Sequence, residues 1–211
     1  MKNTEVYLVR HAEQLKINKG NIIEDSQFSN EKIILSINGE KEAEKISKSI
    51  ELSNVDILWS SNYVRAISTA KYISYQNNIP INIDPNFNER KLGDLIELSK
   101  LGESKKNSYT TEQLLDENLK NKDGESRKEV QNRFLKSLNT LLKENPHKRV
   151  VIVSHGAAIK YMLLKWCYLN NRNQITYNDK VIIEEKLELP NVIKLTFDSE
   201  NLINIENIEC M

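Results

Sequence analysis

The feature that most constrains this chain is the apolar run Val150-Val151-Ile152-Val153. Four consecutive β-branched residues predict a strand that is buried on both faces, as the central strands of parallel sheets are. A shorter run of the same character, Val6-Tyr7-Leu8-Val9, lies close to the N-terminus. Strands of this kind need helices on each side of their sheet, so the two runs favour an α/β fold.

The remaining patterns alternate between strand and helix. Apolar residues at helical spacing predict helices over residues 40–50, 62–75, 124–145 and 156–169. Short apolar runs predict further strands at 56–59 and 80–83, and a closing hairpin at the sheet edge from 192–197 and 202–205. We therefore expect an α/β protein with a mostly parallel central sheet and helices on both faces.

The length of 211 residues fits a single domain over residues 1–211. The six glycines and four prolines are scattered, and they build no linker between two halves. One polar, lysine-rich stretch, 95–122, interrupts the alternation of strand and helix. Long loops in compact domains are commonly functional lids or disordered segments, so we interpret this stretch as a lid-like insertion. Its lysines are more simply explained as a solvated face than as a screen for anionic substrates.

The composition argues against several classes of function. Thirty basic residues balance thirty acidic ones, so a protein that grips nucleic acid along a basic face is not expected. The chain has no apolar run near the roughly 20 residues that span a bilayer, and its N-terminus lacks a signal peptide's apolar segment. A cytoplasmic protein without a membrane partner is therefore expected. Cys167 and Cys210 are far apart and form no metal-ligand cluster, so no metal site is expected.

Two histidines follow the two strongest strands. Arg10-His11 comes directly after the first strand, and His155 comes directly after the run at 150–153. Ligands of open α/β sheets bind outside the carboxyl ends of the strands, so both side chains lie where a site is expected. A single histidine at a strand end is more often structural, but two at equivalent ends favour a functional role. His147 follows a helix-stopping proline and is interpreted as a surface residue.

Arginines and one carboxylate complete the set of candidates. Arg65 follows a third strand end, and together with Arg10 it suits a tetrahedral oxyanion, because each guanidinium donates two parallel hydrogen bonds. The alternative is that each arginine pairs with a nearby carboxylate. Glu89 follows the strand at 80–83, where a carboxyl group can serve as a general acid. Since the chain has thirty acidic residues, this position alone is a weak indication.

Several segments together resemble one known family. Leu8-Val9-Arg10-His11-Ala12-Glu13 resembles the Arg-His-Gly-Glu signature of the histidine phosphatase superfamily, the phosphoglycerate mutase-like group. Residues 60–70 are similar to its Ser-Ser-Pro-Leu-x-Arg-Ala-x-Gln-Thr-Ala block, and residues 150–156 to its second histidine block. Shorter matches lie at 35–39, 89–93, 124–126 with Arg133, and 190–191. The matches follow the family's order and span residues 6 to about 197 of this chain.

The resemblance implies a phosphoglycerate mutase-like fold and phosphoryl transfer through a phosphohistidine on His11. It implies three catalytic residues, His11, Glu89 as the general acid, and His155. Arg10 and Arg65 would bind the phosphoryl oxygens of the substrate, with His155 as a further donor. The resemblance calls for no cofactor and no metal. The expected partner is a small phosphorylated metabolite, and the oligomeric state stays open.

Other functions within the same family also stay open. The family contains phosphoglycerate-type mutases and catalytically inactive proteins that bind phosphate or phosphoproteins. The modest length of 95–122 favours a hydrolase of phosphate monoesters over a mutase. The presence of all five core positions argues against a non-catalytic binding module.

The chain departs from the family's pattern at Ala12, Gln14, Asn62 and Ser68. An asparagine that often contacts phosphate in the family corresponds here to Ile17, with Asn18 one position further. The substrate preference that this contact helps to set is therefore not readable from the motif.

Overall fold

The computed structural model describes residues 3–16, 30–94, 112–184 and 187–208. Its central sheet has six strands in the order β3-β2-β4-β1-β8-β9. These are β1 (Thr4–Arg10), β2 (Ile57–Ser60), β3 (Ile81–Ile83), β4 (Arg149–Ser154), β8 (Asn191–Asp198) and β9 (Asn201–Ile208). The first four are parallel to one another, and β8 and β9 form an antiparallel hairpin against β1. The expected mostly parallel sheet and its closing hairpin at the edge are confirmed.

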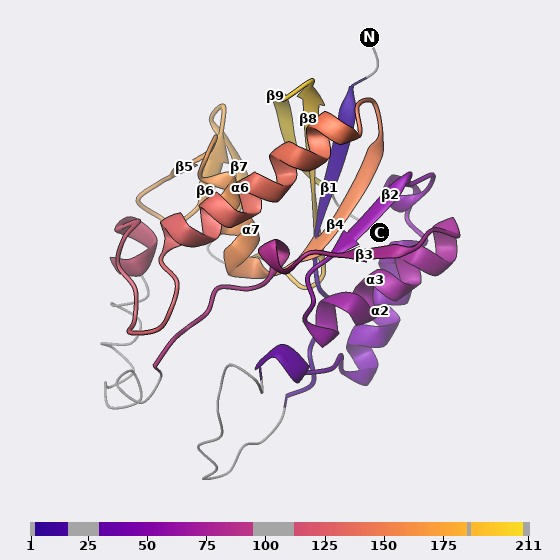
Figure 1. Ribbon diagram of the computed structural model, residues 1–211, viewed down its shortest axis with the longest axis horizontal. Helices are drawn as coiled ribbons and strands as arrows, with labels where there is room; N and C mark the ends of the chain where they lie inside the picture. The colour runs from indigo at the N-terminus through magenta and orange to yellow at the C-terminus, as the bar shows by residue number, and fades with distance from the viewer. Residues whose placement is uncertain (1–2, 17–29, 95–111, 185–186, 209–211) are drawn as a thin grey trace.

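Four helices cover the sheet, two on each face (Figure 1). They are α2 (Ile37–Ser47) and α3 (Val64–Asn77) on one face, and α6 (Arg127–Glu144) and α7 (Gly156–Leu163) on the other. Alternate residues of the central strands point to opposite faces. Val150 and Ile152 pack with α6 and α7, whereas Val151 and Val153 pack with α2 and α3. The apolar runs are buried on both faces because both faces carry a helical layer.

Side-chain caps set where the helices begin. Ser36 accepts a hydrogen bond from Gly39 N, so α2 begins at Ile37, three residues before the start expected from the apolar spacing. Ser126 and Glu129 form a capping box at the start of α6, an arrangement that contributes about 1 kcal/mol. A 3₁₀ turn, η1 (Ile50–Leu52), follows α2, and a second, η2 (Pro85–Phe87), follows β3. This second turn leads directly into the segment that carries Glu89.

The helix expected over residues 156–169 was wrong in its second half. The helix α7 ends at Leu163, and the chain continues into β5 (Tyr168–Leu169). This strand pairs with β6 (Ile175–Tyr177), which pairs with β7 (Lys180–Ile183), in a separate antiparallel sheet of three strands. An apolar run has the same appearance in a buried helix and in a buried strand, so the sequence did not reveal this change.

The base of the 95–122 stretch is closed by hydrogen bonds between its two flanks. Asp94 N donates to Lys122 O at 2.8 Å, and Glu125 N donates to Lys91 O at 2.9 Å. Gly93 has a φ of +73°, and a Cβ there would lie 2.2 Å from Lys122 O, so only glycine fits this close approach. Residues 95–111 lie outside the described part of the chain.

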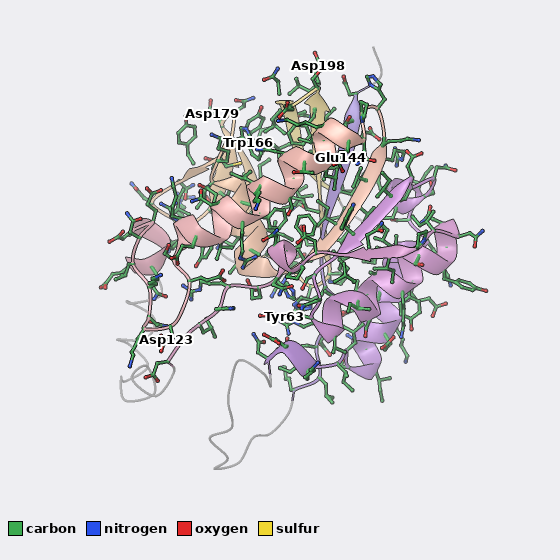
Figure 2. All side chains as sticks on the ribbon, in the orientation of Figure 1. Tyr63, Asp123, Glu144, Trp166, Asp179 and Asp198 are labelled. Carbon is green, nitrogen blue, oxygen red and sulfur yellow. The ribbon has the colours of Figure 1, made fainter. Side chains whose placement is uncertain are left out.

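The carboxyl ends of the parallel strands lie together at one end of the central sheet. Tyr63, at the start of α3, and Asp198, the last residue of β8, lie at opposite ends of the sheet (Figure 2). The carboxyl ends of β1, β2 and β4 are at the Tyr63 end, because Arg10 pairs with Ser154 and Ser60 pairs with Val153. Across the described residues, no helix is long and apolar enough to cross a membrane.

Candidate active site

Four of the five candidate residues line one pocket at the carboxyl ends of the parallel strands. The pocket has a volume of about 510 Å³. Its lining consists of Arg10, His11, Glu13, Gln14, Lys16, Asn30, Arg65, Glu89, Arg90, Leu92, Ala157 and Leu189. His155 is fully buried and lies beside His11, with 5.1 Å between the ring centroids. The structure therefore brings all five candidates together, with His155 behind the pocket surface rather than on it.

The His11 imidazole is held with Nε2 unprotonated. Its Nδ1 lies 2.8 Å from the main-chain oxygen of Ala12, and Arg65 Nε donates to its Nε2 at 3.1 Å. A carbonyl oxygen only accepts and a guanidinium N–H only donates, so Nδ1 carries the proton and Nε2 carries the lone pair. Burial, Arg65 and Arg10 lower the pKa of His11 to about 3, against the opposing effect of the Ala12 hydrogen bond. The imidazole of His11 is thus neutral at physiological pH.

The two arginines of the pocket are held by main-chain carbonyls. Arg10 Nη1 donates to Leu187 O, and Arg65, which is 3% exposed, donates from Nη1 to Asn30 O. In the described part of the chain neither arginine forms an ion pair, so the alternative of a carboxylate salt bridge is not what holds them. Gly156 allows the approach of Arg10, because a Cβ there would lie 3.2 Å from the guanidinium carbon. Two guanidinium groups therefore lie beside the buried imidazole of His11.

The carboxylate of Glu89 contacts the main chain of the first turn of α7. Its carboxylate accepts hydrogen bonds from Ala158 N at 3.0 Å and from Ala157 N at 3.3 Å. The loop that carries it is clamped by Arg133, which donates to Glu89 O at 3.2 Å and forms an ion pair with Glu125 at 2.8 Å. The Gly-Glu-Ser segment and Arg133, noticed in the sequence, thus serve to fix the main chain around the carboxylate.

The environment of His155 differs from that of His11. Its Nε2 lies 2.8 Å from Ser61 Oγ, and the Tyr63 ring packs against it with 4.8 Å between centroids. Burial lowers the pKa of His155 well below its ordinary value, as do the neighbouring His11 and the arginines nearby. Ser61 lies inside the motif at residues 60–70, but the sequence offered no sign that it touches the histidine.

Two pocket residues were not anticipated either. Arg90 is 8% exposed and donates to Gln113 at 2.8 Å. Lys16, which follows the first histidine motif in the sequence, also lines the pocket. Their position next to motif residues was the only available signal. His147 is exposed, as expected. Ile17 and Asn18, the two positions considered for the family's asparagine, lie outside the described residues.

Known proteins are similar to this chain in sequence and in fold. The model of the histidine phosphatase superfamily (branch 1) matches residues 6–178 of the chain. The chain belongs to this superfamily. Among curated relatives, the histidine phosphatase described here is 30% identical over 160 residues to the uncharacterized phosphatase PhoE of Bacillus subtilis, covering 76% of each chain. It is 26% identical over 161 residues to the probable phosphoglycerate mutase GpmB of Proteus mirabilis, covering 75% of this chain and 73% of the relative.

A solved structure shares the fold over almost the whole length. The mycobacterial glucosyl-3-phosphoglycerate phosphatase superposes with a TM-score of 0.70 at 18% identity, covering 97% of each chain. At this identity the likeness concerns the fold. The phosphoglycerate mutase-like fold expected from the motifs is therefore confirmed for this histidine phosphatase.

Proposed function

We propose that this member of the superfamily is a phosphatase that hydrolyses phosphate monoesters of small metabolites through a phosphohistidine on His11. The observation that carries the proposal is the lone pair of His11 Nε2, which faces a pocket lined by Arg10 and Arg65. A neutral imidazole is a good nucleophile, and phosphoryl transfer depends mainly on positioning and on charge stabilisation. The pocket supplies both from side chains alone.

The first step transfers the phosphoryl group to the enzyme. His11 Nε2 attacks phosphorus, the ester P–O bond breaks, and Glu89 gives its proton to the departing oxygen. Arg10 and Arg65 stabilise the charge on the equatorial oxygens. In the free enzyme Arg65 Nε donates to the nucleophilic nitrogen, so substrate binding has to move this donor onto a phosphoryl oxygen.

The second step releases the phosphoryl group to water. Glu89 takes a proton from the attacking water, the P–N bond to His11 breaks, and inorganic phosphate leaves. Glu89 thereby regains the proton it donated in the first step. Glu89 is already held in place for both steps, since its carboxylate accepts from the Ala157 and Ala158 N–H groups at the start of α7.

Turnover of p-nitrophenyl phosphate tests the enzymatic function. We expect steady release of nitrophenol and a phosphoenzyme that survives base and is lost in acid. A non-catalytic phosphate-binding module would bind inorganic phosphate without either signal. A screen over sugar phosphates, phosphoglycerates, phosphoserine and nucleotides then identifies the substrate.

A mutase is the second candidate, because one relative is named a probable phosphoglycerate mutase. The two functions differ in the acceptor of the phosphoryl group, which is water in a phosphatase and the substrate in a mutase. Incubation with 3-phosphoglycerate separates them. We expect release of inorganic phosphate to exceed formation of 2-phosphoglycerate, and the reverse ratio would assign the protein as a mutase.

We also propose that the chain is one domain in which 95–122 is a lid-like insertion. Support comes from the closed base of this stretch, whose flanks include Arg90 and Leu92 in the pocket lining. Gln113, within the stretch, holds Arg90 through a hydrogen bond of 2.8 Å. A substitution at Gln113 should therefore change KM more than the rate of the chemical step. A cytoplasmic location stays a prediction from the sequence.

A further inference from the structure

The hydrogen bonds around Ser61 determine which nitrogen of His155 carries a proton. The first of them fixes the amide of Asn88, a residue next to Glu89. Asn88 Oδ1 accepts from the main-chain N–H of Asn62 at 3.0 Å. Because a main-chain N–H only donates, the atom that faces it is the amide oxygen and not the NH₂ group. The orientation of the Asn88 side chain is therefore set by the backbone.

The same oxygen determines the direction of the Ser61 hydroxyl. Ser61 Oγ lies 2.9 Å from Asn88 Oδ1, and it has to donate its single proton there, since an amide oxygen only accepts. Tyr63 N donates to Ser61 Oγ at 3.1 Å and occupies one acceptor position. The remaining acceptor position faces His155 Nε2 at 2.8 Å. Nε2 of His155 must therefore carry a hydrogen.

The other nitrogen of His155 is then unprotonated in the neutral ring. His155 Nδ1 is buried and has no hydrogen-bond partner within the described residues. Since Nε2 is committed to Ser61, Nδ1 is the nitrogen whose lone pair no group among the described residues uses. His11 shows the reverse arrangement, with its proton on Nδ1 and its lone pair on Nε2.

We propose that Asn88, acting through Ser61, is a positioning residue that keeps Nδ1 of His155 for the bound phosphoryl group. The inference rests on the proposed function, which places a phosphoryl group beside these histidines. A phosphoryl oxygen and an unprotonated Nδ1 are both acceptors, so they cannot form a hydrogen bond until Nδ1 carries a proton. The His155 ring therefore takes up a proton from solvent at Nδ1 when the anion binds, keeps it, and donates a hydrogen bond through it to a phosphoryl oxygen.

The surroundings of His155 explain why the proton and the anion bind together. The charged or titratable groups that face it are Arg10 and His11 at the end of β1, Arg65 in α3, Arg133 in α6, and Tyr63 before α3. These arginines and burial disfavour an imidazolium in the free protein. A phosphate dianion adds negative charge to the same pocket, so it offsets the arginines and makes protonation favourable.

Nuclear magnetic resonance of protein labelled with ¹⁵N-histidine reads the proton positions directly. The chain has three histidines, so the spectrum is simple, and His147→Gln assigns the exposed one. In the free protein at pH 7 we expect His155 protonated at Nε2 and His11 at Nδ1. Saturation with inorganic phosphate should protonate both nitrogens of His155. A free His155 protonated at Nδ1, or a ring that stays neutral with phosphate bound, would overturn the inference.

Variants of the relay test the role of Asn88. Asn88→Leu removes the acceptor, so Ser61 can donate to His155 Nε2 and the ring should change to the Nδ1–H form. Asn88→Asp keeps an acceptor and should restore the Nε2–H form. In Asn88→Leu the Ser61 O–H points at Nε2 and opposes the second protonation, so the ring loses its positive charge in the complex. We expect kcat to fall about 10–100-fold with little change in KM, the range known for the loss of partners that orient metal-binding histidines. An unchanged proton position in folded Asn88→Leu contradicts the proposal.

A matched control and a second variant keep the test decisive. Ser60→Ala removes a neighbouring buried hydroxyl that donates to the Ser61 carbonyl, and it should leave the proton position and kcat as in the wild type. If Asn88→Leu does not fold, Ser61→Ala replaces it, and His155 should then populate both forms. Failure of the proposed function is distinct, because absence of turnover and of phosphate binding would leave the Nε2–H form of free His155 intact.

Discussion

The two histidines at the ends of β1 and β4 occupy equivalent places and have opposite properties. Both follow neighbouring parallel strands, whose last residues Arg10 and Ser154 are paired in the sheet, and both are buried. The Nε2 of His11 accepts from a guanidinium, whereas the Nε2 of His155 contacts a serine hydroxyl. The parallel sheet places the two rings, and the loops around each ring decide which nitrogen is protonated.

We propose that this difference gives the two rings different roles. A histidine whose Nε2 lone pair faces a cationic pocket can attack phosphorus. A histidine with Nε2 committed to Ser61 has no free nucleophilic nitrogen on that side and acts as a donor once it is protonated. The predictions below separate these roles, beginning with the largest expected effect.

Removal of each histidine in turn is the strongest test. His11→Ala should lower kcat on the order of 10⁶-fold, as loss of other catalytic nucleophiles does, and should abolish phosphoenzyme labelling. His155→Ala should slow turnover strongly but still permit labelling, because the nucleophile remains. Quench-flow with ³²P-labelled substrate measures both. Labelled phosphoenzyme in His11→Ala would break the assignment of roles.

The role of Glu89 as the proton donor is tested with two leaving groups. Glu89→Gln keeps the shape of the side chain but cannot donate, so an alkyl phosphate should slow by about 10²–10⁴-fold in the phosphorylation step. A p-nitrophenyl ester should slow far less, since its leaving group departs unaided. Single-turnover rates give the comparison, with Glu13→Gln as the control for a second carboxylate of the pocket. Equal slowing of both esters would point to Glu13 as the next candidate.

The guanidinium that contacts His11 is tested by a change of cation. Arg65→Lys keeps the charge but loses the two-pronged donor, so vanadate should bind about 1.5–3 kcal/mol more weakly, roughly 10–150-fold. Inhibition constants measure this loss. Arg172→Lys, at an exposed arginine, should leave vanadate binding unchanged. An unaltered constant in Arg65→Lys would place this side chain outside the phosphoryl site.

The lowered pKa of His11 predicts a pH dependence of stability. The unfolded chain binds a proton at this residue near pH 6.5, whereas the folded protein does so at a pKa of about 3. The contribution of the neutral His11 to the free energy of unfolding is thus present in full above pH 6.5. It is lost as the pH falls, and the free energy of unfolding is lower by about 2 kcal/mol at pH 5. Urea unfolding between pH 7 and pH 5 should show a shallower dependence in His11→Gln than in the wild type. His147→Gln, at an exposed histidine, should retain the wild-type slope, and equal slopes in all three proteins would contradict the buried neutral state of His11.

The smallest expected effect is that of a chelator. Both roles are carried out by protein side chains, so dialysis against EDTA should leave kcat unchanged. No group of three or more metal-ligating side chains that could hold an ion occurs among the described residues. A large loss of activity that magnesium or zinc restores would contradict the division of roles between the two histidines.

The sequence by itself determined the layers of the fold and the candidate residues at the centre of the pocket. Apolar β-branched runs and helical spacing are local properties, and they located the strands of the main sheet and most of its helices. Parallel strands end at one edge of a sheet, so residues that follow these strands converge without any knowledge of their contacts. Arg10, His11, Arg65 and His155 were therefore candidates from their places in the chain, whereas Glu89 was chosen among thirty acidic residues through the resemblance to the family.

Only the tertiary structure decided how the apolar stretch after Leu163 ends and which nitrogen of each histidine is protonated. The strand β5 forms because it finds β6 as a partner, and a local pattern does not contain that pairing. The protonation of His11 depends on Arg65, 54 residues away, and that of His155 on Ser61, 94 residues away. These hydrogen bonds join groups that only folding brings together, and burial of the rings removes the water that would otherwise accept or donate in their place.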